Sequence, residues 1–131
     1  MSNWSHVSAI VRVDNIEHLN GKINFSNIFG KECLWDSDSI TWDDFNNNPD
    51  KYLPMGSEGS LHLSVWENPD KHCCDAYTVS IFGDLRDHDN PQEIINWFRS
   101  KLINLWIRQA VITVDNEWNG TTTWVYDRES N

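Results

Sequence analysis

The feature that most constrains the fold is a capped amphipathic helix set between segments of alternating polarity. Asn90 is a favourable N-cap, Pro91 suits the first turn because its missing N–H would be unbonded there, and Glu93 completes a capping-box-like spacing. Apolar residues then recur on one helical stripe. The sequence therefore predicts one long helix that begins at residue 90, with a stripe formed by Ile94, Phe98, Leu102, Leu105 and Trp106.

Five segments alternate apolar and polar residues with the period of a half-buried strand. The expected strands cover residues 5–14, 60–66, 76–82, 110–115 and 121–126. We expect Gly83 to close the third strand, and Asn119-Gly120 predicts a two-residue hairpin between the last two. Shorter elements are expected as a helical turn at 26–29 closed by Gly30 and a short helix around 40–47.

This order of elements predicts an α+β fold. Strand, short helix, strand, strand, helix, strand is the order of a ferredoxin-like split βαβ sandwich, an antiparallel sheet with one long helix. The last strand would be an added C-terminal β-hairpin strand. With 131 residues and no linker or internal repeat, the chain is expected to form a single domain over 1–131.

The charge balance narrows the classes of partner. Twenty acidic and ten basic side chains give a formal net charge of −10, which repels phosphate backbones and favours a partner with a basic surface. We therefore expect no direct binding of nucleic acid. Eight Trp are a heavy aromatic load, so some of these rings should lie at the surface and offer rigid contact area.

Cysteine usage and hydropathy bear on location. The three cysteines include the adjacent pair Cys73 and Cys74, which suits neither a disulfide framework nor a secreted scaffold, so a reducing compartment fits better. No window approaches the roughly 20 apolar residues of a membrane span. We expect a cytoplasmic protein without membrane contact, and a homo-oligomer formed through the edge of the C-terminal strand is compatible with the pattern.

The leading candidate site is an acidic, aromatic segment over residues 35–45. It has no Lys or Arg, so its carboxylates could steer a basic partner while its rings anchor it. A calcium loop is not indicated, because the sixth and twelfth positions counted from Asp36 hold Thr41 and Asn47 instead of Gly and Glu. No metal or other cofactor is therefore expected at the partner-binding residues, which are Trp35, Asp36, Asp38, Trp42, Asp43, Asp44 and Phe45.

Two sharper alternatives remain open. The glycine-rich residues Gly56, Ser57, Gly59 and Ser60 could approach a small nucleotide with Arg86 as the cation, although the segment leads into a strand and has no Lys. Alternatively, His88 and Asp84 could act as a general base pair of a small hydrolase, although no Ser or Cys nucleophile in a recognisable turn accompanies them.

Three segments resemble small, functionally uncharacterised accessory proteins of tailed phages. They are residues 56–61, 81–87 and 107–111, so the resemblance covers the second half of the chain better than the first. It implies no chemistry of its own. Because such proteins often act on host machinery, it implies an inhibitor of host defence, of the anti-CRISPR kind, located in the cytoplasm of the host cell. The interpretation is a non-enzymatic acidic protein that mimics nucleic acid on a basic surface of a host protein.

Overall fold

The centre of the fold is a five-stranded antiparallel open sheet. The computed structural model describes residues 2–15, 23–32, 47, 49–70, 75–88 and 90–127. The strands lie in the order β2-β3-β1-β4-β5, and every neighbouring pair is antiparallel. Their bounds are β1 Trp4–Asn15, β2 His62–Glu67, β3 Asp75–Arg86, β4 Trp106–Asn116 and β5 Gly120–Val125.

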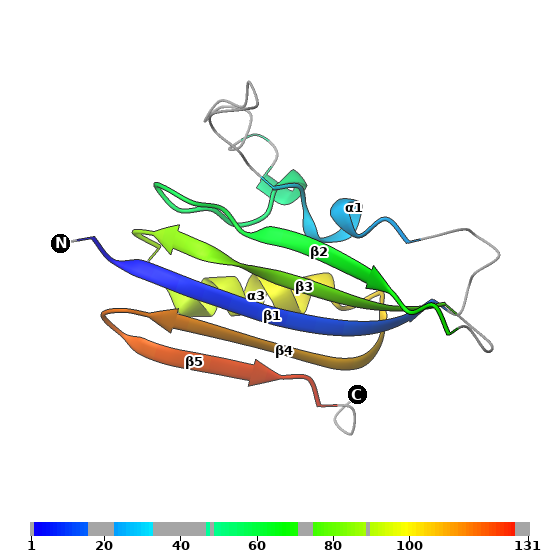
Figure 1. The fold of residues 1–131 in the computed structure, drawn as a ribbon. Helices are drawn as coiled ribbons and strands as arrows, with labels where there is room; N and C mark the ends of the chain where they lie inside the picture. The colour runs from blue at the N-terminus through cyan, green and yellow to red at the C-terminus, as the bar shows by residue number, and fades with distance from the viewer. Residues whose placement is uncertain are drawn as a thin grey trace.

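The helices lie beside the sheet, and α3 covers one of its faces. α1 (Phe25–Phe29) and the 3-10 turn η2 (Pro49–Lys51) follow β1, whereas α3 (Pro91–Lys101) connects β3 to β4. Since β3 and β4 are both antiparallel to β1, they run parallel to each other with β1 between them. Figure 1 shows α3 behind the sheet and no described helix in front of it. The result is an α+β architecture in which, among the described residues, one sheet face is covered by helices and the other is open.

The alternation of β1 explains which face is covered. Val7, Val11 and Val13 are at most 2% exposed, whereas Ile10 between them is 39% exposed. The neighbouring strands bury residues in the same register, and α1 and α3 close the core with their apolar sides. The largest fully buried side chains include Phe29, Leu53, Leu61, Val79, Ile81, Leu85, Ile94, Ile95, Phe98 and Ile112.

Several predicted elements are confirmed, with different bounds. Asn90 is the N-cap residue and Pro91 the first residue of α3, but the Asn90 side chain makes no capping hydrogen bond. The helix ends at Lys101 instead of continuing to Trp106, which begins β4. α1 is the predicted helical turn, capped by the Asn24 side chain. The expected helix around 40–47 lies almost wholly outside the described residues.

Two predictions about glycine were wrong. Gly83 does not close β3, which continues to Arg86. A Cβ at residue 83 would lie 2.7 Å from the Ser60 carbonyl oxygen, so the missing side chain allows a close approach within a continuous strand. Gly120 pairs opposite Asn116 with φ +88°, which leaves a three-residue loop at 117–119 in place of a two-residue hairpin.

We predict that Gly59→Ala destabilises the fold much more than Gly120→Ala. Both glycines have positive φ, so either alanine costs about 1–2 kcal/mol in backbone strain. A Cβ at residue 59 would also lie 2.0 Å from the Asp84 carbonyl oxygen, whereas one at residue 120 meets nothing within 4 Å. We expect the Gly59 variant to lose about 3 kcal/mol or more in urea unfolding. Equal losses would contradict the close packing of residues 56–60 on β3.

Candidate functional site

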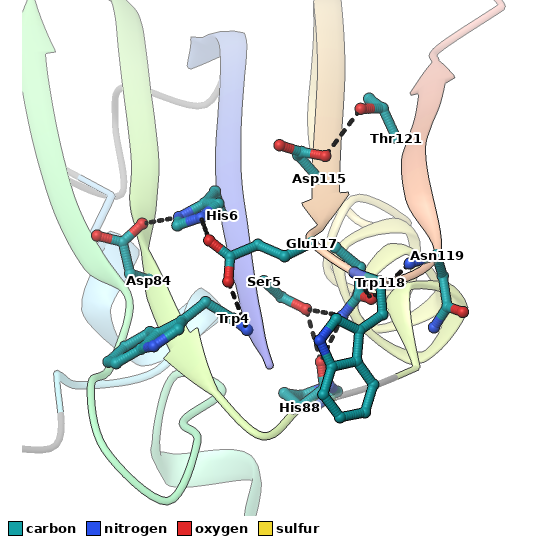
Figure 2. Close-up of polar contacts among 11 residues, drawn as sticks. Trp4, Ser5, His6, Asp84, His88, Asp115, Glu117, Trp118, Asn119 and Thr121 are labelled. Carbon is teal, nitrogen blue, oxygen red and sulfur yellow. Dashed lines mark hydrogen bonds and ion pairs between the residues drawn. The ribbon is translucent and has the colours of Figure 1, made fainter. Parts of the chain in front are cut away.

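A histidine between two carboxylates lies on the open face near one end of the sheet. His6 Nδ1 is 2.6 Å from Asp84 Oδ1, and His6 Nε2 is 3.1 Å from Glu117 Oε2. Asp84 comes from β3 and Glu117 from the β4–β5 turn, so the imidazole joins β3 to that turn across β1 (Figure 2). Because only an imidazolium donates from both ring nitrogens, this geometry favours the protonated form.

The electrostatics of His6 follow from these contacts. Hydrogen bonds to Asp84 and, second, to Glu117 raise the pKa of His6 above its ordinary value of 6.5. Glu117 is itself well positioned, because its backbone N–H donates to the Trp4 carbonyl and its Oε1 accepts from the Trp4 N–H. The side chain of His6 is 42% exposed, so solvent screens the interaction.

Beneath this cluster, on the covered face, a buried polar group holds three segments together. The Ser5 hydroxyl donates to the His88 carbonyl at 2.6 Å, and Asn116 Nδ2 donates to Ser5 Oγ at 2.9 Å. Asn116 Oδ1 accepts from the N–H groups of Trp118 and Asn119, which orders the β4–β5 turn. Since Ser5 and Asn116 are fully buried, these bonds also satisfy groups that would be costly to leave unpaired.

A second polar group adjoins the cluster at the end of β3. The Arg86 guanidinium donates to Glu58 Oε1 at 2.6 Å and to Ser2 Oγ at 3.0 Å, and its Nε is 3.8 Å from Asp87 Oδ2. Asp87 has φ 59° and also accepts from the Ser57 hydroxyl. We name the exposed carboxylates here and around His6 the acidic end of the sheet; they are Glu58, Asp84, Asp87, Asp115 and Glu117.

Exposed apolar side chains lie on the open face beside the acidic end and further along the strands. Phe82, two residues before Asp84 on the same side of β3, is 48% exposed. Ile10 and Trp66 on neighbouring strands are 39% and 56% exposed. Ile10 lies opposite Val111, which lies opposite Val125, so apolar side chains continue from β1 to β5. Phe82 lies opposite Ser8, and Trp66 lies opposite Thr78, further along the strands from the acidic end. Exposed apolar area beside charge is characteristic of protein-binding surfaces.

The partner-binding residues expected from the sequence lie outside the described residues. They are Trp35, Asp36, Asp38, Trp42, Asp43, Asp44 and Phe45. The hypothesis that this segment forms the contact surface therefore stays a prediction.

The five residues of the nucleotide hypothesis are brought together, but several of their donors are engaged. Residues 56–60 pack on the end of β3, where the Ser57 N–H donates to the Arg86 carbonyl and the Gly56 N–H to the Gly59 carbonyl. The Ser60 hydroxyl donates to the Leu61 carbonyl. An anion at Arg86 would have to compete with Glu58, 2.6 Å away. The hypothesis stays a prediction, and this arrangement does not favour it.

The two residues expected for a hydrolase, His88 and Asp84, contact different partners. Asp84 binds His6, whereas His88 Nε2 lies 3.9 Å from Glu93 Oε2. Ser5, adjacent to His6 in sequence, points to the covered face and is bonded to the His88 carbonyl (Figure 2). Within the described part of the chain, the His6 cluster therefore has carboxylates around a base but no hydroxyl or thiol nucleophile hydrogen-bonded to it.

The sequence reasoning missed His6 and Glu117. Alternation in residues 5–14 places His6 on the polar face, which is the one signal available. To predict its contact with Asp84, one would need to know that β3 continues past Gly83 and that His6 pairs with Asp84. The alternation of apolar and polar residues indicates neither. Glu117 lies after the expected strand 110–115, and the expectation of a two-residue hairpin at 119–120 did not place it in the loop 117–119.

Two structural features are absent from the described ranges. No group of three or more His, Cys, Asp and Glu there could hold a metal ion. None of the described helices has both the length and the apolar character to cross a bilayer. Comparison with protein-family models, curated proteins and solved structures finds no match to this chain.

We predict that His6 stabilises the fold more at low pH than at high pH. Its pKa is raised in the folded state, so the stabilisation is complete below about 6.5, the unfolded value, and is lost as pH rises through the folded pKa. Urea unfolding should show that His6→Asn loses up to about 1 kcal/mol near pH 5.5 and less near pH 9.

The matched control is the same substitution in an Asp84→Asn/Glu117→Gln background. There the histidine has no carboxylate partner, so its pH-dependent contribution should disappear. An unchanged pH dependence in that background would show that these carboxylates are not its cause.

Proposed function

We propose that the chain is a non-enzymatic binding protein that occupies a basic surface of another protein. The observation that carries the proposal is the open sheet face, where the acidic end borders exposed Phe82 and exposed Ile10 and Trp66 follow further along the strands. Opposite charge accelerates docking, and buried aromatic contacts slow dissociation. A sheet face covered by helices would expose neither the carboxylates nor the aromatic rings to a partner.

The charge of the acidic end supports this proposal. Its five carboxylates are opposed by Arg86 and by His6, and Asp115 is bonded to the Thr121 hydroxyl. The excess of negative charge at the acidic end has the same sign as the net charge of −10 of the whole chain. In a phage infection, which the resemblance of the second half implies, the target would be a host defence protein, and the chain would occupy its nucleic-acid-binding site as a mimic of nucleic acid.

The strand order supports a finer description of the fold. Excluding β5, the order β2-β3-β1-β4 with α3 connecting β3 to β4 across β1 is that of a ferredoxin-like split βαβ sandwich. We therefore propose that the chain is a ferredoxin-like domain with one long helix and β5 as an added hairpin strand. α1 would stand in the place of the first helix, shortened to five residues.

The first test separates the acidic end from charge in general. Asp84→Asn/Asp115→Asn/Glu117→Gln removes three carboxylates from the acidic end, and Asp50→Asn/Asp70→Asn/Glu93→Gln removes three from other exposed positions. A target captured from host lysate and purified should bind the first variant about tenfold more weakly or worse, and the second within about threefold of the parent.

Salt provides an independent readout in the same experiment. The parent complex should weaken between about 0.05 and 0.5 M NaCl, and the first variant should depend less on salt than the second. Equal affinities of the two variants would contradict a contact through the acidic end. Loss of the target's own nucleic-acid binding on complex formation would support mimicry.

A third variant tests the acidic, aromatic segment 35–45 that was predicted from the sequence. Changing Asp36, Asp38, Asp43 and Asp44 to Asn should abolish binding to the same target, because the carboxylates of this segment are expected to face the basic surface. The thermal unfolding midpoint measures whether the fold is intact. Unchanged affinity would rule out binding through this segment.

A further inference from the structure

The outer edge of β5 is an unpaired backbone edge within the described part of the chain. β5 ends the strand order, with β4 on its inner side. Tyr126 donates its N–H to the Ala110 carbonyl at 2.9 Å. Because alternate residues of an antiparallel strand direct their backbone groups to the same neighbour, Trp124 and Thr122 also face β4. The residues that present N–H and C=O outward are therefore Thr121, Thr123 and Val125.

This edge lacks the features that usually prevent strands from pairing. β5 contains no charged residue and no proline, whereas exposed edges are commonly blocked by one or the other. The opposite edge, β2, contains Glu67 and has His62 paired with Glu32. In a chain with a net charge of −10, β5 is a segment where two copies can meet without placing like charges directly opposite.

A groove lies along the same edge on the covered side of the sheet. It has a volume of about 650 Å³, within the range of pockets that enclose a bulky group. Arg99 lies over the Trp124 ring, 5.2 Å from its centroid. The apolar lining is made by Leu102, Ile103, Leu105, Trp124, Val125 and Tyr126. Ile103 and Val125 are 78% and 60% exposed, so much of this apolar surface is uncovered.

We propose that two copies of the chain form a symmetric dimer by antiparallel pairing of β5 with β5, and that Trp118 of each copy covers the groove of the other. Outward-facing residues must lie opposite one another, so full overlap places Thr123 opposite Thr123 of the second copy and Thr121 opposite Val125. This register provides about six backbone hydrogen bonds between the copies.

The register places the β4–β5 turn of one copy near the groove of the other. Gly120 of one copy lies opposite Tyr126 of the other, so Trp118, two residues earlier, extends past Tyr126 toward the end of the groove. Trp118 is 63% exposed in the single chain. An indole is large and loses little rotamer entropy when buried, which suits it to fill an apolar groove.

The dimer should strengthen with salt, in contrast to the complex proposed with a basic partner. Each copy has a net charge of −10, so long-range repulsion opposes association and is screened at higher ionic strength. The two proposals therefore respond to salt in opposite directions, and failure of one leaves the other standing.

The test is sedimentation equilibrium of the full chain up to about 200 μM in about 0.05 and 0.5 M NaCl. We expect a dimer that tightens at high salt. Thr123→Lys should weaken it at least about tenfold, because the two-fold axis places the new charges opposite each other although the net charge falls in magnitude. Ser64→Lys, exposed on the same face but on the opposite edge strand β2, is the control and should leave the dimer intact.

Trp118→Ala tests the groove, and we expect it to weaken the dimer about tenfold. Thermal unfolding of each variant confirms that the monomer still folds. A monomer at every concentration and salt, or a dimer that Thr123→Lys leaves unchanged, would overturn the pairing of β5. A dimer sensitive to Thr123→Lys but indifferent to Trp118→Ala would overturn the placement of Trp118.

Discussion

The structure depends on the pairing of β1 with a strand on each side. β1 contacts β3 along its whole length and β4 along most of it, so its backbone hydrogen bonds are satisfied within the sheet. This double pairing fixes the register of both neighbours. A shift of one residue on either side would turn Val7, Val11 and Val13 outward and move His6 away from Asp84. The core and the acidic end therefore rest on the same register.

The two faces of β1 connect stability with surface chemistry. Ser5 and His6 are adjacent, and alternation directs Ser5 to the buried bonds with Asn116 and the His88 carbonyl while His6 faces solvent. The same Asn116 orders the turn that supplies Glu117. A buried hydrogen-bond network thus positions an exposed charge cluster on the other side of the strand.

The α+β class and the positions of the five strands could be predicted from the sequence, but the meeting of His6, Asp84 and Glu117 could not. Alternation located all five strands, and Asn90-Pro91 located the start of α3, because these signals are local. The end of α3 was missed because Leu105 and Trp106 continue its apolar spacing although Trp106 begins β4. The continuation of β3 through Gly83 depends on the approach of Ser60, which lies more than twenty residues earlier. His6, Asp84 and Glu117 meet only through register, which is a property of paired strands and not of any one segment.

The uneven distribution of charge makes the two proposed associations compatible in one molecule. The acidic end includes Glu117 and Asp115, which lie by the N-terminal end of β5, whereas the strand itself is uncharged. In the proposed dimer this end of one copy lies beside the C-terminal end of β5 in the other, so the two acidic ends stand apart by about the length of the strand or more, about 20 Å. That distance exceeds the screening length near physiological salt. In the proposed register the odd-numbered residues of β5 lie opposite odd-numbered residues of the second copy, so their side chains share one face of the extended sheet. The open faces of both copies therefore lie on the same side, accessible to a basic partner.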